Sequence, residues 1–407
     1  MKILQVNKYH YVRGGAERYC LDLSQMLEKA GHEVAFFSMD HPKNVPTKWS
    51  KYFVSRISFS EPTLRDYLIA PLRILYSFEA KRKFKKLLLE FKPDIIHLHN
   101  IYNQISPSIL PVAKKMNIPV IMHLHDYSLV SPDHQLFCRG KIYTRALGGH
   151  YLRCALDRCH KNSFSKSLLA SLAMILHHKI LKIYEKNIDA YIAPSEFMKS
   201  ICVRAGFSKE KIFAIPNFVS SGFAPQKLST NLKDYILFYG RLSEEKGLDC
   251  LIRAMKDVTA PYTLKIVGEG PYAEHCNALI KELQLELRIE MIPAMQGETL
   301  RTMIAEATAL MLPSIWYENM SLTLLESIGM GKVVIGSRIG GIPEVLKDNI
   351  NGFLCEANNP EDWTRAINNL ANADLKGIGE AAAKTAESFA PDLHLKKIVS
   401  IYERYVS

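Results

Sequence analysis

The stretch from Ser314 to Glu344, SIWYENMSLTLLESIGMGKVVIGSRIGGIPE, interrupts an apolar, helix-like run with two carboxylates, Glu318 and Glu326. On a helix over LTLLESIGM, Glu326 falls about 40° from Leu322, beside the face that packs inward. A carboxylate there is costly without a partner. Glu318 precedes the first turn, where free backbone amides and the helix dipole favour an anionic ligand. The pattern predicts that both carboxylates and the start of this helix bind one ligand that carries hydroxyl and phosphate groups.

On either side of this stretch, strand-like apolar runs alternate with helical patterns, which predicts parallel sheets covered by helices. The predicted strands are KILQVN (2–7), EVAFFS (33–38), DIIHLH (94–99), VIMHLH (120–125) and AYIAPS (190–195) in the first half, and YILFYG (235–240), TLKIVG (263–268), IEMIP (289–293), ALMLPS (309–314), KVVIGS (332–337) and GFLC (352–355) in the second. We therefore predict an α/β fold with two Rossmann-like, doubly wound domains over residues 1–218 and 219–385. The polar segment around 217–235 is the predicted linker, and residues 386–407 are a predicted terminal helix that crosses back to the first domain.

The composition is that of a globular chain long enough for two domains, with 407 residues, 48% hydrophobic and 23% charged. No apolar run approaches the roughly 18 residues of a membrane span, and the N-terminal MKILQVNKYHY lacks the apolar core of a signal peptide. We expect a cytoplasmic protein.

The eight cysteines include no CxxC pair, which suits a reducing compartment better than a disulfide scaffold. Cys138, Cys154 and Cys159 have His150 and His160 nearby, and these are residue types that bind metals. Their spacing matches no standard zinc pattern, so buried thiols are the preferred interpretation and no metal is expected.

Charge is distributed unevenly along the chain. Residues 1–220 hold 33 Lys/Arg and 17 Asp/Glu, a net +16, whereas the remainder has a net −5. The first half therefore favours anionic partners, but no recognised nucleic-acid motif is present and nucleic acid is not expected. The segment Arg73 to Lys92, RILYSFEAKRKFKKLLLEFK, has two open interpretations: an amphipathic helix on an anionic membrane surface, or a surface helix that packs one face inward.

Unusual polar residues and glycines follow the predicted strands, and ligands of parallel sheets bind outside the carboxyl ends of strands. They are Gly14 and Gly15, His99 with Asn100, and His125 with Asp126 in the first half, and Arg241, Gly268 and Glu318 in the second. We expect these two sheet edges to face each other across one cleft.

Two of these groups suit an anion. Gly14 and Gly15 permit close backbone approach where a helix begins near Ala16, although a tight turn explains them equally well because GxGxxG spacing is missing. Arg241 and Lys246, in GRLSEEKG, are spaced to converge on a diphosphate. Solvated surface charges are the alternative, and the position directly after a strand favours binding.

The histidines after the third and fourth strands form two pairs, since alternation puts His97 with His99 and His123 with His125 on one face of each strand. His97 and His123 are interpreted as structural. His125 is the stronger functional candidate because Asp126 follows it at the sheet edge. Glycines in VGEGP (267–271) and RIGGIPE (338–344) are interpreted as turn residues, as is Asn217 in IPNF.

The ordered set of motifs resembles the retaining GT-B glycosyltransferases of family four. The set runs from KILQVN with RGGAER through HLHD, APSEFM, IPNF, GRLSEEKG and VGEGP to the E-x7-E stretch with VVIGS, GG and PE, and it covers nearly the whole chain. The resemblance implies a nucleotide-sugar donor held mainly by the second domain and an acceptor held mainly by the first.

The resemblance also implies roles for single residues. Glu326 would bind ribose hydroxyls and Glu318 hydroxyls of the transferred sugar. Backbone amides of Met320, Ser321 and Leu322 would approach the sugar and diphosphate, Arg241 and Lys246 would stabilise charge on the leaving diphosphate, and Gly15 would meet that diphosphate from across the cleft. His125 would contact the donor sugar or order the reacting centre, and the acceptor side would comprise Gly14, His99, Asn100 and Asp126.

In the mechanism that the family implies, the acceptor hydroxyl attacks the face from which the diphosphate leaves, unlike glycosidases with paired catalytic carboxylates. No DxD motif is present, and neither a metal nor a cofactor beyond the substrate is expected. Two features depart from the family pattern. Met320 and Ser321 replace the usual Phe-Gly, where a side chain restricts the turn, and IEMIPAMQGE lacks a glycine after its strand.

HDYSLVSP and the cysteine-bearing stretch after it resemble members that build surface polysaccharides. The function predicted from sequence is therefore transfer of a sugar to a glycan or lipid-linked glycan of the cell surface, at the inner face of the membrane. A nucleotide-sugar 2-epimerase of the same fold is the first alternative, disfavoured by the combination of E-x7-E with GRLSEEKG. A non-catalytic scaffold that binds nucleotide-sugar is the second, and the intact Glu318, Glu326, Arg241 and Lys246 count against it.

Overall fold

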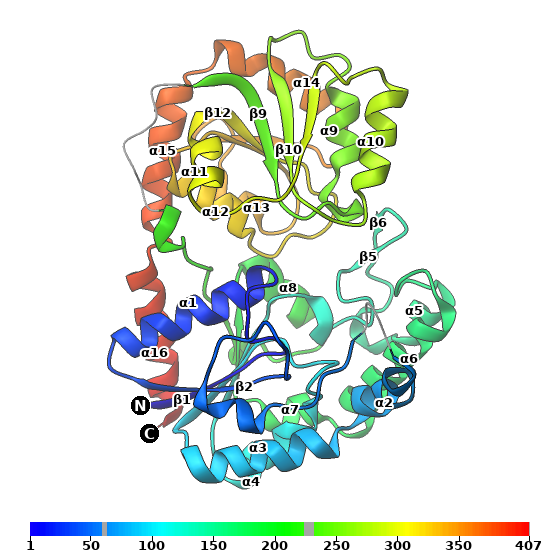
Figure 1. The fold of residues 1–407 in the computed structure, drawn as a ribbon, viewed down its shortest axis with the longest axis vertical. Coiled ribbons are helices and arrows are strands. Elements are labelled where there is room, and N and C mark those ends of the chain that lie inside the picture. The colour runs from blue at the N-terminus through cyan, green and yellow to red at the C-terminus, as the bar shows by residue number, and fades with distance from the viewer. Residues whose placement is uncertain (59–62, 224–231, 407) are drawn as a thin grey trace. The chain divides into compact units, whose positions relative to one another are not determined.

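The computed structural model describes residues 1–58, 63–223 and 232–406 (Figure 1). Eight residues of the predicted linker, 224–231, lie outside these residues. The chain divides into two compact units. Unit 1 comprises Met1–Arg139, Tyr143–Ile215 and Leu395–Ser407, and unit 2 comprises Gly140–Ile142 and Pro216–His394.

Unit 1 is built on a six-stranded sheet in the order β2-β1-β3-β4-β7-β8, and every neighbouring pair is parallel. The strands are β1 (Lys2–Val6), β2 (Glu33–Phe37), β3 (Ile95–Leu98), β4 (Val120–His123), β7 (Ala190–Ala193) and β8 (Ile212–Ala214). The five strands predicted for this half are confirmed. The sixth, β8, was missed because three residues at a sheet edge give no readable pattern.

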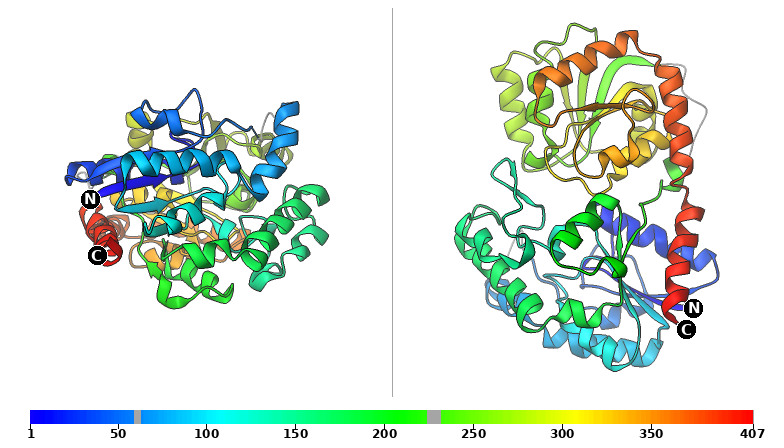
Figure 2. Two further views of the ribbon diagram at one scale, coloured as in Figure 1. Left: turned by 90° about the horizontal axis from the view of Figure 1, so that it is seen from below. Right: turned by 180° about the vertical axis from the view of Figure 1, so that it is seen from behind.

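Helices cover both faces of this sheet (Figures 1 and 2). They are α1 (Gly15–Lys29), α2 (Leu64–Leu75), α3 (Phe78–Phe91), α4 (Leu110–Lys115), α5 (Leu152–Leu156), α6 (Phe164–Met174), α7 (Ile183–Asn187), α8 (Glu196–Arg204) and the end of α16 (Pro391–Val406). Tyr19 of α1 packs against His123, and Phe84 of α3 packs against Phe37 of β2. No described helix has the length and apolar character needed to cross a bilayer.

The segment from Arg73 to Lys92 is not one helix, because α2 ends at Leu75 and α3 begins at Phe78. Arg73 is buried in an ion pair with Glu79, with Nη2 and Oε2 2.6 Å apart. Helix α3 buries Ala80, Phe84, Leu87, Leu88 and Phe91, at the spacing of a helix face that packs inward. The second interpretation of this segment therefore describes α3.

The cysteine-bearing stretch contains a disulfide between Cys138, at the end of β5 (Phe137–Cys138), and Cys159. β5 pairs with β6 (Lys141–Ile142) in a two-stranded hairpin. The preference for free thiols was wrong at this pair, whose side chains only tertiary folding brings together. Cys154 is a buried free thiol, and burial raises its pKa to about 12. Within the described residues no cluster of three His, Cys, Asp or Glu side chains is placed to hold a metal.

Unit 2 is built on a second six-stranded parallel sheet, in the order β11-β10-β9-β12-β13-β14. Its strands are β9 (Lys233–Tyr239), β10 (Thr263–Val267), β11 (Ile289–Ile292), β12 (Ala307–Leu312), β13 (Val334–Ser337) and β14 (Phe353–Cys355), and its helices are α9 (Leu248–Ala254), α10 (Ala273–Glu282), α11 (Gly297–Glu306), α12 (Leu322–Gly329), α13 (Ile342–Val345), α14 (Pro360–Asn369) and α15 (Leu375–Glu387). All six strands predicted for this half are present, and the predicted α/β architecture is confirmed.

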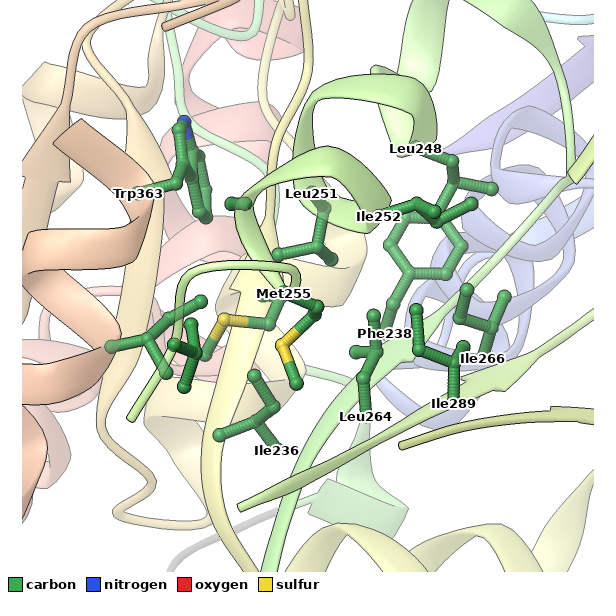
Figure 3. Close-up of a cluster of buried hydrophobic side chains, with 14 of the residues drawn as sticks. Ile236, Phe238, Leu248, Leu251, Ile252, Met255, Leu264, Ile266, Ile289 and Trp363 are labelled. Carbon is green, nitrogen blue, oxygen red and sulfur yellow. The ribbon is translucent and has the colours of Figure 1, made fainter. Parts of the chain in front are cut away.

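Two hydrophobic cores lie on opposite faces of this sheet, because side chains alternate along β9. Ile236 and Phe238 enter the core that also contains Leu251 and Trp363 (Figure 3). Leu237 and Tyr239 enter the other core, which receives Leu324, Leu325 and Ile328 from α12. The second core therefore fixes α12 against the end of β9, which sets the position of the E-x7-E residues.

Candidate active site

The loops after β9 and β12 are joined at the carboxyl edge of the unit 2 sheet, since these two strands are neighbours. The amide of Ile315 donates to the carbonyl of Glu245 at 3.0 Å. Gly247 has φ 71°, and a Cβ there would lie 2.0 Å from the carbonyl oxygen of Pro313. Only glycine permits this approach, which brings Lys246 beside the loop that carries Glu318.

Lys246 and Glu318 form an ion pair at this junction, with Nζ and Oε1 2.6 Å apart. The hydroxyl of Ser314 donates to the same carboxylate oxygen at 2.8 Å. Burial alone raises the pKa of Glu318, but the charge and hydrogen bond of Lys246 outweigh it and hold the pKa below its ordinary value. Lys246 also lies over the ring of Trp316, 5.4 Å from its centroid. The sequence selected both charged residues but did not predict that they pair.

The glycine pair after β13 supports Glu318 from the backbone side. Gly340 has φ 60°, and a Cβ there would lie 2.3 Å from the carbonyl oxygen of Glu318. The amide of Gly341 donates to that oxygen at 2.7 Å. The interpretation of these glycines as turn residues is confirmed, and the turn also holds the Glu318 backbone.

Glu326 lies in the second turn of α12 and is only 4% exposed, as its predicted angle to the buried face requires. The hydroxyl of Tyr239 is 3.2 Å from Oε2 of Glu326 and 3.1 Å from the carbonyl oxygen of Thr323. Tyr239 was not among the site residues predicted from sequence. Its signal was a second tyrosine four residues after Tyr235 in an otherwise apolar strand, on the face that α12 covers.

The start of α12 differs from the expectation drawn from the family pattern. Ser321 is the N-cap residue with φ −69°, which any residue adopts, and its hydroxyl accepts from the amide of Leu324 at 3.3 Å. The expectation that its side chain restricts the turn was wrong. The side chain of Met320 is in the hydrophobic core, and its carbonyl accepts from Asn217 Nδ2 at 3.4 Å. Donor contacts by the backbone of Met320, Ser321 and Leu322 stay a prediction.

Arg241 is exposed in the loop after β9. The neighbouring loop after β10 packs closely on this loop, because Cβ atoms on Gly268 and Gly270 would lie 1.9 Å and 2.0 Å from the carbonyl oxygens of Gly240 and Leu242. This close packing requires glycine at both positions, and the turn interpretation of these glycines stays a prediction. Phosphate binding by Arg241 stays a prediction.

Unit 1 gathers four histidines at the ends of β3 and β4. The rings of His97 and His99 lie 4.5 Å apart, as do those of His123 and His125, which confirms the pairing expected from strand alternation. His99 Nδ1 lies 2.9 Å from His125 Nε2, and His99 Nε2 lies 2.7 Å from Gln5 Oε1. Gln5 Oε1 can only accept a hydrogen bond. His99 therefore donates from Nε2 to Gln5, and His125 donates from Nε2 to Nδ1 of His99.

Burial keeps the imidazoles of His99 and His125 neutral near pH 7. It lowers the pKa of His125 to about 4 and the pKa of His99 well below its ordinary value. His99 has no exposed surface and both of its ring nitrogens have partners, so it lies behind His125 and orients that ring. This geometry argues against the predicted acceptor contact by His99.

The other predicted acceptor residues hold loops in place. Asp126 accepts from the amide of Ser128 at 2.9 Å and caps a short 3-10 turn. Asn100 is buried, and its backbone N–H donates to Asn7 Oδ1 at 3.2 Å. Gly14 is the N-cap of α1, and Gly15 begins the helix one residue before the predicted start, with both residues exposed. Acceptor contacts by Gly14, Asn100 and Asp126, and the diphosphate contact by Gly15, stay predictions.

Comparison with known proteins adds family models and relatives. Residues 13–222 match the model described as Glycosyltransferase Family 4, and residues 223–387 match that described as Glycosyl transferases group 1. An uncharacterized 42.6 kDa protein in the cps region of Klebsiella pneumoniae is 28% identical, over 88% of this chain and 90% of its own length. One of the phosphatidylinositol N-acetylglucosaminyltransferase subunits of Arabidopsis thaliana is 24% identical, over 90% of this chain and 73% of its own length.

Among solved structures, Anabaena HepE in complex with UDP and glucose superposes with a TM-score of 0.70 at 17% identity, covering 99% of this chain and 100% of HepE. This likeness shows the fold, which is that of GT-B glycosyltransferases. Both parts of the sequence match glycosyltransferase models, and both sheets have the expected topology. The chain belongs to glycosyltransferase family 4 and is a glycosyltransferase of group 1 with the GT-B fold.

Proposed function

We propose that the enzyme transfers a sugar from a nucleotide-sugar to a glycan or lipid-linked glycan acceptor, with retention of anomeric configuration and without a metal. The observation that carries the proposal is the set of charged side chains at the start of α12 in unit 2. One cation, Lys246, and two buried carboxylates, Glu318 and Glu326, are held around the start of α12 by Ser314 and Tyr239. Hydroxyls and phosphates of one donor satisfy these groups together.

Each group has a chemical task in this proposal. Glu326 accepts hydrogen bonds from ribose hydroxyls, and Glu318 accepts them from hydroxyls of the sugar. An ammonium has three N–H donors, so Lys246 keeps donors for phosphate while it pairs with Glu318. Together with Arg241, it stabilises negative charge on the leaving diphosphate.

The reaction forms a bond from the acceptor oxygen to the anomeric carbon and breaks the bond from that carbon to the diphosphate oxygen, on one face of the sugar. The acceptor proton passes to the phosphate oxygen that leaves. Neutral His125 donates from Nε2 to His99, so its Nδ1 accepts a hydrogen bond beside the reacting centre without bringing a further positive charge.

The class of acceptor follows from the relatives and from charge. One relative is a protein in a cps region, and another belongs to a phosphatidylinositol N-acetylglucosaminyltransferase. The net +16 of residues 1–220 suits an acceptor that carries pyrophosphate. HepE was solved with UDP and glucose, which makes a UDP-sugar the first donor to test.

The test is product analysis with UDP-, GDP-, ADP- and dTDP-sugars, a lipid-pyrophosphate glycan acceptor and excess EDTA. We expect an acceptor-dependent product whose new linkage, read by NMR, keeps the anomeric configuration of the donor. An inverted linkage or a requirement for metal would contradict the mechanism. Conversion of the nucleotide-sugar in the absence of acceptor would instead identify an epimerase.

A further inference from the structure

Helix α2 exposes four large apolar side chains and buries two charged ones. Leu64, Tyr67, Leu68 and Leu72 share one helix face and are 67–86% exposed. On the opposite face, Asp66 and Arg73 are buried at 8% and 4% exposure. A surface helix normally shows the reverse arrangement.

The buried polar groups of α2 have partners, so this orientation is well determined. Asp66 and Thr63 form a reciprocal capping box at the helix N-terminus. Arg73 pairs with Glu79 at 2.6 Å and donates to the Ser55 hydroxyl at 2.7 Å. Rotating α2 to bury its leucines would break the ion pair of Arg73 with Glu79 and leave that carboxylate to Lys83, 3.2 Å away.

Helix α6 contacts α2 (Figure 1) and also combines buried serines with exposed apolar side chains. Ser167 and Ser171 have no exposed surface, and Ser171 donates to the carbonyl of Tyr151 at 2.8 Å. Phe164 and Leu172 are about half exposed, at 49% and 47%. We call the exposed side chains of both helices the apolar face: Leu64, Tyr67, Leu68, Leu72, Phe164 and Leu172.

The segment that contains α6 is strongly basic. Residues 152–182, which contain α6, include six Lys/Arg and one Asp/Glu. The six basic side chains are all exposed: Arg153, Arg158, Lys161, Lys166, Lys179 and Lys182. The single acid, Asp157, is paired with Arg145 at 2.9 Å.

We propose that the apolar face and the basic side chains around α6 dock unit 1 on an anionic lipid bilayer. The leucines and aromatic rings enter the interfacial region, and the lysines and arginines meet lipid phosphates. A second copy of this chain fits less well, because it would set one basic surface against another. This surface lies on α2 and α6, whereas the membrane interpretation left open from sequence concerned the segment from Arg73 to Lys92.

The experiment measures co-sedimentation of the full chain with vesicles of phosphatidylcholine alone or with about 30% phosphatidylglycerol. Wild type is expected to bind the anionic vesicles, with binding that weakens as salt rises. The double variant Leu68→Ser/Leu72→Ser is expected to bind about tenfold or more weakly, because two side chains no longer enter the interface. Its thermal midpoint should match wild type, since both leucines are largely exposed.

Matched controls separate this surface from general effects. Leu287→Ser changes a leucine of unit 2 that is 96% exposed, and it should leave vesicle binding unchanged. Lys161→Glu/Lys166→Glu should lose binding to anionic vesicles, whereas Lys281→Glu, an exposed lysine of unit 2, should retain it.

Three results would overturn the proposal. The first is equal binding to neutral and anionic vesicles, and the second is normal binding by Leu68→Ser/Leu72→Ser. The third is a wild type that forms an oligomer and does not bind vesicles, while this double variant is a monomer. The last result would assign the apolar face to self-association. None of these readouts depends on sugar transfer.

Discussion

At the scale of single residues, the site rests on two contacts that join different strands. Lys246 pairs with Glu318, and Tyr239 reaches Glu326. In each contact, one residue comes from the end of β9 or from the loop after it, and the other comes from the segment after β12. The carboxylates were identifiable from sequence because charge in a buried helical run is costly. Their partners were not, because strand order is a tertiary property.

The ion pair predicts an unequal response to removal of its two members. Lys246→Met leaves the Glu318 carboxylate buried without its cation, so stability should fall, whereas Lys246→Met/Glu318→Gln should recover about 1–3 kcal/mol of that loss. Urea denaturation of the two single variants and the double variant measures this coupling. Transfer should fall by about 10²-fold or more in all three. Variants at Lys246 lose stabilisation of charge on the leaving diphosphate, and Glu318→Gln loses the carboxylate that accepts from sugar hydroxyls. Additive stability losses would show that the pair contributes nothing.

Tyr239→Phe removes the hydroxyl beside Glu326 and keeps the ring in the core. We expect the donor KM to rise several-fold, about 1 kcal/mol of binding, with little change in kcat, because Glu326 acts on the nucleotide and not on the transferred bond. The matched control is Tyr235→Phe on the same strand, whose hydroxyl donates to the Met303 carbonyl at 2.6 Å, away from Glu326. A similar rise in KM for both variants would remove Tyr239 from the site.

At the scale of elements, the strands could be predicted from sequence, whereas the contacts between the loops that follow them could not. Apolar runs such as YILFYG and VIMHLH correspond to β9 and β4 because a strand buried on both faces has a continuous apolar signature. β8 has three residues and no such signature. The outward apolar face of α2 was also beyond sequence analysis, because periodicity identifies an amphipathic helix without saying which face meets the protein.

The glycine in the loop after β13 leads to a prediction at this scale. Gly340→Ala places a Cβ against the Glu318 backbone, whereas Gly297→Ala has a similar φ of 68° and nothing within 4 Å. Both variants carry a left-handed backbone cost of about 1–2 kcal/mol. Only Gly340→Ala should also lose donor affinity, measured by titration calorimetry, because it displaces Glu318. Equal donor affinity in the two variants would contradict the positioning role of the loop after β13.

At the scale of the whole molecule, the two Rossmann-like sheets were predictable from the alternation of elements. The buried histidines of unit 1 make stability depend on pH, which composition does not reveal. Burial lowers the pKa of several histidines, to about 4 for His10, His125, His134 and His177 and to about 3 for His160. The unfolded chain binds protons near pH 6.5, so stability is full above that pH and falls as the pH drops toward 4.

We expect the thermal midpoint to fall between pH 7.5 and pH 5.5, with each of these histidines contributing about 1 kcal/mol at pH 5.5. Asp133, whose pKa burial raises to about 6, works in the opposite direction. His10→Leu, in a pocket with Phe36 and Phe53, should reduce the fall, and His275→Gln, at an exposed position in unit 2, should not. A midpoint that stays constant over this range would show that the histidines do not control it.

The central claim is that unit 2 holds a nucleotide-sugar through Glu326 and the Lys246–Glu318 pair. Thermal shift with UDP-, GDP-, ADP- and dTDP-sugars tests it most directly, because a ligand that binds only the folded state raises the unfolding midpoint. We predict that one nucleotide series raises the midpoint of wild type and of Leu287→Ser, and that Glu326→Gln loses most of that shift. No shift with any of the four series, or an undiminished shift in Glu326→Gln, would contradict the account.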